Sequence, residues 1–211
     1  MQKIEQLIKE KAKDLLAAEQ VTRVIAWQKG ELFYDNAPAY FSKTEELGAL
    51  VYNAFCAANL SKYLIANTKK AEKTAVFLKP CDTYSLNQLL KDRRVQREQV
   101  LVIGIPCAGM VDINKIKEQG LKGIVGITED GDNLKVATAY GKKEVARAEV
   151  LLNKCLACKG SAYAVSDETL GEPVAVKHAP YDRFAEVGKL ESLSPQERFA
   201  FWQQELSKCI R

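Results

Sequence analysis

The chain has 211 residues, of which 47% are hydrophobic and 27% charged, so it can bury a core without relying on disulfides. Its 31 basic and 27 acidic residues leave a formal net charge of +4 with no long basic run, which argues against nucleic acid as a partner. The charged N-terminus lacks the apolar segment of a signal peptide, and no apolar run is long enough for a membrane span, so we expect a cytoplasmic protein.

Helical and strand patterns alternate along the chain. An amphipathic helix is expected over residues 3–18, because apolar residues recur there at helical spacing with Lys and Glu opposite. Strands are expected at 21–27, 31–36, 74–79, 100–105, 123–128, 134–140 and 172–177. Further helices are expected at 59–70, 83–92, 113–120 and about 142–153.

The fold class follows from the middle of the chain. The continuous apolar run "VLVIGI" at 100–105 is typical of a strand buried on both faces of a parallel sheet. With "TAVFLK" at 74–79 and the helix between them it makes a strand–helix–strand unit, which should cross over right-handed and set its strands parallel. We therefore expect an α/β fold with a mixed, largely parallel sheet flanked by helices.

A separate helix is expected at the C-terminus. Ser194, Pro195 and Glu197 make a capping-box signature, with proline in the first turn. The helix that follows carries its apolar side chains on one stripe, formed by Phe199, Trp202, Leu206 and Ile210.

Six cysteines in a reducing compartment point to metal ligands or reactive thiols rather than disulfides. Cys81 and Cys107 each come just after a predicted buried strand. If those strands are parallel neighbours, about 5 Å apart, both thiols lie at the carboxyl edge of the sheet, where open α/β sheets bind ligands. Cys155 and Cys158 form a C-x-x-C pair. Four thiolates are the ligand count of a [4Fe–4S] cluster or of a structural zinc.

Other interpretations of these residues stay open. A lone C-x-x-C can be a thioredoxin-type redox pair, but such a pair normally opens a helix after a strand, whereas this one closes the helical stretch expected at 142–153. Cys56, taken alone, is explained as well by a small buried hydrophobic residue as by a functional thiol. His178, the single histidine, is expected at the surface. No catalytic residue is predicted.

The stretches "VFLKPCDTYSLNQLL", "VLVIGIPCAGMVD" and "KCLACKG" resemble the coenzyme-dependent hydrogenase and formate dehydrogenase beta-subunit family, most closely its iron–sulfur branch in anaerobes. "FCAANLSKYL" and "SPQERFAFWQQELSKCIR" extend the resemblance over nearly the whole chain. It implies an iron–sulfur domain that passes electrons between a partner oxidoreductase and a carrier. By motif it implies that the cluster ligands are Cys81, Cys107, Cys155 and Cys158, with Cys56 as the reserve ligand.

The resemblance also raises the question of a bound flavin. Carriers in the wider family include a deazaflavin coenzyme that is reached through bound FAD. The chain has no G-x-G-x-x-G motif and no P-loop, although flavin sites of this family do not depend on them. Because the flavin-binding members are longer, we do not favour FAD here.

The C-terminus departs from the family pattern. In this branch "CIR" usually begins a ferredoxin-like module, whereas this chain ends at Arg211. We expect an α/β iron–sulfur domain at 1–192 and a C-terminal helix at 193–211, the start of a truncated module. The rest of the module is either lost or carried by a ferredoxin-like partner chain.

The sequence thus predicts an iron–sulfur electron-transfer subunit of a cytoplasmic anaerobic oxidoreductase complex, of hydrogenase, formate dehydrogenase or heterodisulfide reductase type. One [4Fe–4S] cluster would pass single electrons, and substrate chemistry would belong to partner subunits. Two alternatives remain: a zinc-stapled structural or interaction subunit, and a thiol–disulfide oxidoreductase using Cys155 and Cys158.

Overall fold

The computed structural model describes residues 2–67, 72–158, 160, 162–172, 174, 176–177 and 181–209. It divides into two compact units, Met1–Ala179 and Pro180–Arg211. The expectations for Lys70, His178, Ile210 and Arg211 lie outside the described residues. The domain boundary predicted after residue 192 stays a prediction.

A mixed sheet with the strand order β2–β1–β4–β5–β9 forms the centre of the first unit, and β3 pairs with β1 beside this path. Its strands are β1 Arg23–Lys29, β2 Asn36–Phe41, β3 Leu50–Val51, β4 Thr74–Leu78, β5 Val100–Gly104 and β9 Glu168–Thr169. The pairs β1–β4, β4–β5 and β5–β9 are parallel, whereas β2 and β3 are antiparallel to β1. The largely parallel sheet expected from the sequence is confirmed.

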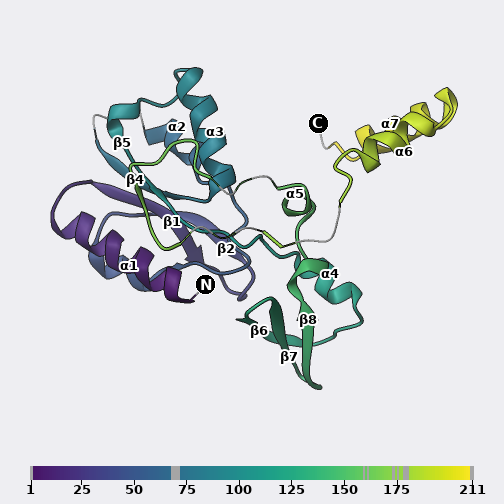
Figure 1. Cartoon of the computed structure of the whole chain (residues 1–211), viewed down its shortest axis with the longest axis horizontal. Helices are drawn as coiled ribbons and strands as arrows, with labels where there is room; N and C mark the ends of the chain where they lie inside the picture. Colours follow the sequence, from purple (N-terminus) through teal and green to yellow (C-terminus); the bar gives the residue numbers. More distant parts are fainter. Residues whose placement is uncertain are drawn as a thin grey trace. The chain divides into compact units, whose positions relative to one another are not determined.

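Helices flank this sheet, as Figure 1 shows. The two long ones are α1 Gln2–Ala17 and α3 Pro80–Lys91, and the shorter segments are η1 Thr44–Ala49, η2 Ser61–Tyr63, α2 Leu64–Asn67 and η3 Arg97–Gln99. Ile8, Ala12 and Leu15 of α1 and Leu86 of α3 are buried in the core. All five residues of β4 are buried, as expected for a strand covered on both faces.

A second, antiparallel sheet was not expected. It consists of β6 Ile124–Asp130, β7 Asn133–Thr138 and β8 Gly141–Ala146, and it lies next to α4 Ile113–Glu118 (Figure 1). The helix predicted at about 142–153 is therefore wrong. Gly141, with a φ of +137°, helps to turn the chain so that β8 pairs along the whole of β7. Only η4 Arg147–Glu149 and α5 Asn153–Leu156 are helical in that stretch.

The small sheet has a hydrophobic cluster of its own. Val136 of β7 and Val145 of β8 pack with Ile116 of α4 and with Phe55. Phe33 and Tyr34 pack partly buried against the same cluster. The two sheets thus have separate cores within one unit, joined by the segments that follow β3 and β5.

Two other predicted strands are displaced. Residues 31–35 form a turn, in which the Asp35 amide donates to the Leu32 carbonyl at 3.0 Å, so pairing with β1 begins only at Asn36. The strand predicted at 172–177 is not formed by its described residues; β9 takes the edge beside β5 instead. The helix predicted at 59–70 is divided into η2 and α2, and its last three residues lie outside the described residues.

The second unit contains α6 Ala185–Ser192 and α7 Pro195–Ser207. The predicted capping box is confirmed, because the Ser194 hydroxyl accepts from the Glu197 amide at 3.3 Å and the Glu197 carboxylate accepts from the Ser194 amide at 2.8 Å. Phe199, Trp202 and Leu206 are exposed on α7. Within the described ranges, no helix is both long and apolar enough for a membrane crossing.

Replacing Leu86 tests the packing of α3 on the sheet. Leu86→Ala removes a fully buried side chain, so we expect a loss of about 2–5 kcal/mol in the free energy of unfolding, measured by urea denaturation. Leu32→Ala is the control, because Leu32 is 49% exposed, and it should change the free energy by about 0.5 kcal/mol or less. Equal losses for the two variants would contradict the described core.

Candidate functional site

The two strand-end cysteines leave the sheet from neighbouring strands. Cys81 lies in the first turn of α3 directly beyond β4, and Cys107 follows β5. The two strands are paired in parallel up to Leu78 and Gly104, and the Ile105 amide continues the ladder to the Leu78 carbonyl at 2.9 Å. Because the carboxyl ends of parallel strands meet at one edge, both cysteine segments emerge side by side.

The C-x-x-C pair is held against this edge by backbone contacts. The Leu152 amide donates to the Met110 carbonyl at 2.9 Å, and the Met110 amide donates to the sulfur of Cys155 at 3.3 Å. This exchange fixes α5 beside the segment that carries Cys107. Sequence reasoning expected a longer helix before the pair, but α5 is a single turn that contains Cys155 and ends before Cys158.

Gly160 contacts both Cys158 and Cys81. Its amide donates to the sulfur of Cys158 at 3.3 Å. A Cβ on Gly160 would lie 3.1 Å from the Cys81 amide nitrogen and 3.4 Å from the Cys158 sulfur, so a side chain there would crowd both cysteines. The loop after the C-x-x-C therefore packs directly on the start of α3.

The four thiols act on one another electrostatically. Burial is the main cause that raises the pKa of Cys81, to about 12, and the charges on Cys107 and Cys158 raise it further. Burial likewise raises the pKa of Cys107, and the charge on Cys155 raises it further. Burial also raises the pKa of Cys155, and the charge on Cys158 adds to that rise. The pKa values of Cys81, Cys107 and Cys155 are thus each raised in part by another thiol of the group. Their role as ligands stays a prediction.

Exposure differs around this group, which we call the cysteine tetrad (Cys81, Cys107, Cys155 and Cys158). Cys107 and Cys155 are buried and Cys158 is half-buried, whereas Cys81 is exposed as a residue although neighbouring atoms desolvate its thiol. Tyr163 borders the buried side, because a Cβ on Gly104, the last residue of β5, would lie 2.7 Å from its ring. Burial and the charge on Cys107 raise the pKa of Tyr163 to about 12. The tetrad therefore has a protected side on β5 and an open side at the start of α3.

The remaining two cysteines have different surroundings. Cys56, the reserve ligand, is fully buried, and burial raises its pKa to about 12. Its sulfur accepts from the Asn53 amide at 3.4 Å, and the charge of Lys79 opposes the shift. Cys209 is exposed in the second unit. All six cysteines are free thiols.

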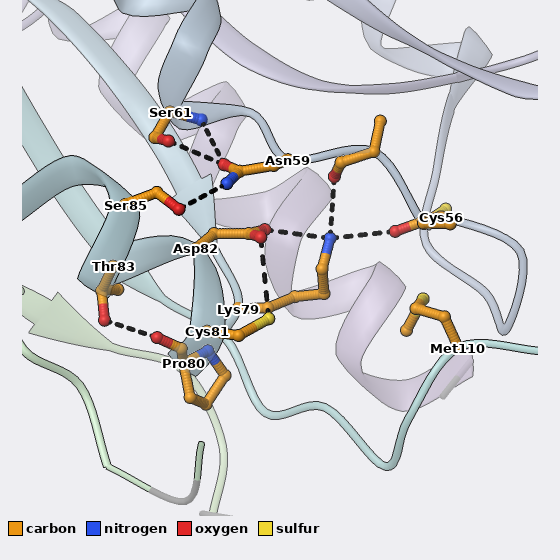
Figure 2. Close-up of polar contacts among 12 residues, drawn as sticks. Cys56, Asn59, Ser61, Lys79, Pro80, Cys81, Asp82, Thr83, Ser85 and Met110 are labelled. Atoms are coloured by element: carbon orange, nitrogen blue, oxygen red, sulfur yellow. Dashed lines mark hydrogen bonds and ion pairs between the residues drawn. The ribbon is translucent and has the colours of Figure 1, made fainter. Parts of the chain in front are cut away.

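Lys79 stands two residues before Cys81, where the sequence suggests that its charge could offset that of a cluster, but the sequence did not reveal its burial. It is 1% exposed and forms an ion pair at 3.0 Å with Asp82, which is 3% exposed. Figure 2 shows its ammonium group between Asp82 and the carbonyl of Cys56. Its charge lowers the pKa of Cys81, Cys107 and Cys155, against the effect of burial. The sequence signal that could have pointed to Lys79 is the presence of a charged residue at the end of a strand as apolar as β4.

The donor set of the tetrad suits an iron–sulfur cluster. Four thiols supply the ligand number of a [4Fe–4S] cluster, and backbone amides near cluster sulfurs are one way in which proteins tune such groups. The Met110 and Gly160 amides already point at two of the sulfurs, and an amide interaction with Gly109 lowers the pKa of Cys107. A single tetrahedral zinc would need its thiolates about 3.8 Å apart. Over the part of the chain that the structure describes, no three His, Cys, Asp or Glu side chains are gathered closely enough for one metal ion.

Comparison with known proteins places the chain in a family. The family model for the C terminus of the coenzyme F420 hydrogenase/dehydrogenase beta subunit matches residues 71–180, just over half of the chain. The chain belongs to this family. The matched region contains all four cysteines of the tetrad, and the resemblance inferred from the sequence is confirmed.

Two curated relatives are formate dehydrogenase subunits. The chain is 32% identical over 99 residues to the F420-dependent formate dehydrogenase subunit beta of Methanocaldococcus jannaschii, covering 47% of this chain and 26% of the relative. It is 31% identical over 91 residues to the F420-dependent formate dehydrogenase 1 subunit beta of Methanococcus maripaludis, covering 43% and 24%. The chain thus spans about a quarter of the length of these relatives.

A solved structure shares the fold. A chain of the F420-reducing [NiFe] hydrogenase complex from Methanosarcina barkeri aligns with a TM-score of 0.59 at 12% identity. The alignment covers 74% of this chain and 62% of that chain. At this identity the likeness concerns the arrangement of helices and strands.

Thiol labelling tests the surroundings of the cysteines. In metal-free protein at pH 8, iodoacetamide should label exposed Cys209 first and Cys56 last, because Cys56 is buried and its pKa is about 12. The labelling rate of exposed Cys81 should rise by about tenfold per pH unit between pH 8 and 10, since its pKa of about 12 leaves it mostly protonated throughout. Peptide mass spectrometry gives the order, and equally fast labelling of Cys56 and Cys209 would contradict the burial described.

Proposed function

We propose that the chain is an iron–sulfur electron-transfer subunit of an oxidoreductase complex of the hydrogenase or formate dehydrogenase type. Cys81, Cys107, Cys155 and Cys158 are its proposed cluster ligands. The observation that carries this proposal is the arrangement of four free thiols from three segments. Cys81 and Cys107 follow the paired strands β4 and β5, the Met110 amide donates to the Cys155 sulfur, and Gly160, which donates to the Cys158 sulfur, packs on the Cys81 amide. The names of the relatives, both F420-dependent formate dehydrogenase beta subunits, support the type of complex.

The chain's own residues would prepare the site for such a group. A bound [4Fe–4S] cluster would supply one-electron transfer. Burial of Cys107 and Cys155 keeps water from two of the sulfurs, and the Met110 and Gly160 amides offer hydrogen bonds to Cys155 and Cys158. The exposed Cys81 leaves one side accessible to a partner.

Partner subunits would complete the activity. We propose that they carry the chemistry on hydrogen or formate and that this chain passes electrons between them and a carrier. A carrier related to coenzyme F420 is suggested by the relatives' names. A ferredoxin-like partner chain and a cytoplasmic location belong to the same proposal, and FAD is not assigned to this chain.

Thiol–disulfide exchange by Cys155 and Cys158 is less well supported. The attacking thiol of such enzymes needs a thiolate near neutral pH, and it is usually helped by a lowered pKa. Here burial raises the pKa of Cys155. Its buried position also limits access by another disulfide.

Metal analysis tests the proposal directly. Anaerobically purified protein should contain about four irons and four sulfides per chain, and reduction with dithionite should give an electron paramagnetic resonance signal. If the first preparation lacks iron, reconstitution with iron and sulfide should restore both. One zinc per chain, without iron after reconstitution, would overturn the cluster in favour of a structural metal.

Single cysteine replacements test the ligand set. Cys81→Ala, Cys107→Ala, Cys155→Ala and Cys158→Ala should each lose most of the iron or convert the cluster to a smaller one, because each removes a thiolate ligand. Cys209→Ala is the control, as Cys209 is exposed in the second unit, and it should keep the full content. Cys56→Ala should also keep the full iron content. If Cys56→Ala loses iron while Cys81→Ala retains it, Cys56 is a ligand in place of Cys81.

A further inference from the structure

Lys79 is surrounded on all sides by protein. Its ammonium donates to the carbonyls of Cys56 and Ala58, each at 2.9 Å, and pairs with the Asp82 carboxylate at 3.0 Å. It also lies 4.2 Å from the centre of the Trp27 ring, as a cation–π contact. Figure 2 shows the Cys56 carbonyl and the Asp82 carboxylate on either side of this nitrogen.

Burying this pair is energetically demanding. Two ions removed from water lose several kcal/mol of hydration each, and a well-packed apolar pair of similar volume is often no less stable. Fold stability alone therefore gives little reason for a charged pair at the end of β4. The position of the pair gives another reason, because Lys79 and Asp82 stand on either side of Cys81 in the chain.

The two charges act on the tetrad in opposite directions. The Asp82 carboxylate lies 3.7 Å from the Cys81 sulfur and 3.0 Å from the Lys79 ammonium, so a fixed negative and a fixed positive charge both stand beside the tetrad. Both groups lie in the protein interior, where charge interactions are stronger and less screened by salt than at the surface. Lys154, beside Cys155, also donates to the 56–58 segment, at 2.7 Å to the Ala57 carbonyl, but it differs in being exposed.

We propose that the buried Lys79–Asp82 pair sets the reduction potential of the redox group held by the tetrad, Lys79 raising the potential and Asp82 lowering it. This inference rests on the proposed function. In the reduction, one electron passes from a dithionite-reduced mediator to the oxidised cluster, and no covalent bond or proton is required. The added electron makes the site more negative, so a fixed positive charge nearby favours the reduced form and a fixed negative charge opposes it.

A purely structural role predicts a different pattern. Lys79 also ties the 56–58 segment to the start of α3, and any variant that breaks this tie could loosen the site. Loosening would move the potential in one direction whichever partner is removed. Opposite shifts for the two partners are expected only if their charges act on the cluster.

The experiment compares the potentials of matched variants by mediator titration followed by electron paramagnetic resonance. Lys79→Met keeps most of the side-chain volume without the charge, and it should lower the equilibrium constant for reduction at least tenfold, about 59 mV for one electron. Asp82→Asn keeps an acceptor for Lys79 and should shift the potential upward. Lys154→Met, which removes an exposed charge, should shift it by less than Lys79→Met because solvent screens that lysine.

A double variant guards against poor folding of Lys79→Met. Lys79→Met with Asp82→Asn leaves no charge unpaired, and its potential should lie below that of Asp82→Asn alone. Potential shifts of the same sign for Lys79→Met and Asp82→Asn would overturn this inference alone. So would a shift on replacing Lys79, in the wild type and in Asp82→Asn, that is no larger than the shift caused by Lys154→Met. Wild-type protein that takes up no iron and sulfide would overturn the proposed function and this inference with it.

Discussion

The parallel pairing of β4 and β5 is the constraint on which the candidate site depends. The ladder from Thr74 and Val100 to Leu78 and Gly104 fixes where each strand ends, and Cys81 and Cys107 follow those ends. A slip of one residue would reverse which side chains of β4 face each side of the sheet. It would also disturb the turn that starts α3, and so the position of Cys81. Because β4 is buried at every residue, this register is strongly specified by packing.

The site is completed by segments that have little regular structure. The C-x-x-C depends on α5, a single turn, which is held by the exchange between Leu152, Met110 and Cys155. Helices this short are not stable alone, so the turn exists because its backbone groups find partners on the segment after β5. The tetrad therefore joins rigid strand ends to a loop that relies on them. Lys79 adds a second tie, from the end of β4 to the 56–58 segment.

What the sequence predicted well was local and strongly patterned. The apolar runs of β4 and β5, the amphipathic face of α1 and the capping box at Ser194 each carry a signal within a few residues, and each was found where expected. The errors arose where pairing decided the outcome. Residues 141–146 contain a single buried side chain, Val145, and it is the neighbouring strand β7 that makes them a strand. The burial of Lys79 was equally hidden, because its acceptors come from residues 56–58, far away in the chain.

The tetrad combines two demands that oppose each other. If the tetrad binds a cluster as proposed, its thiols must lose their protons, yet burial raises the pKa of Cys81, Cys107 and Cys155 and so favours the protonated form. Binding must therefore release protons, and loading of the site should become easier as the pH rises. The Met110 and Gly160 amides and the ammonium of Lys79 reduce this cost by stabilising negative charge at sulfur. A site that is protected from water can in this way still accept the charge that a cluster brings to it.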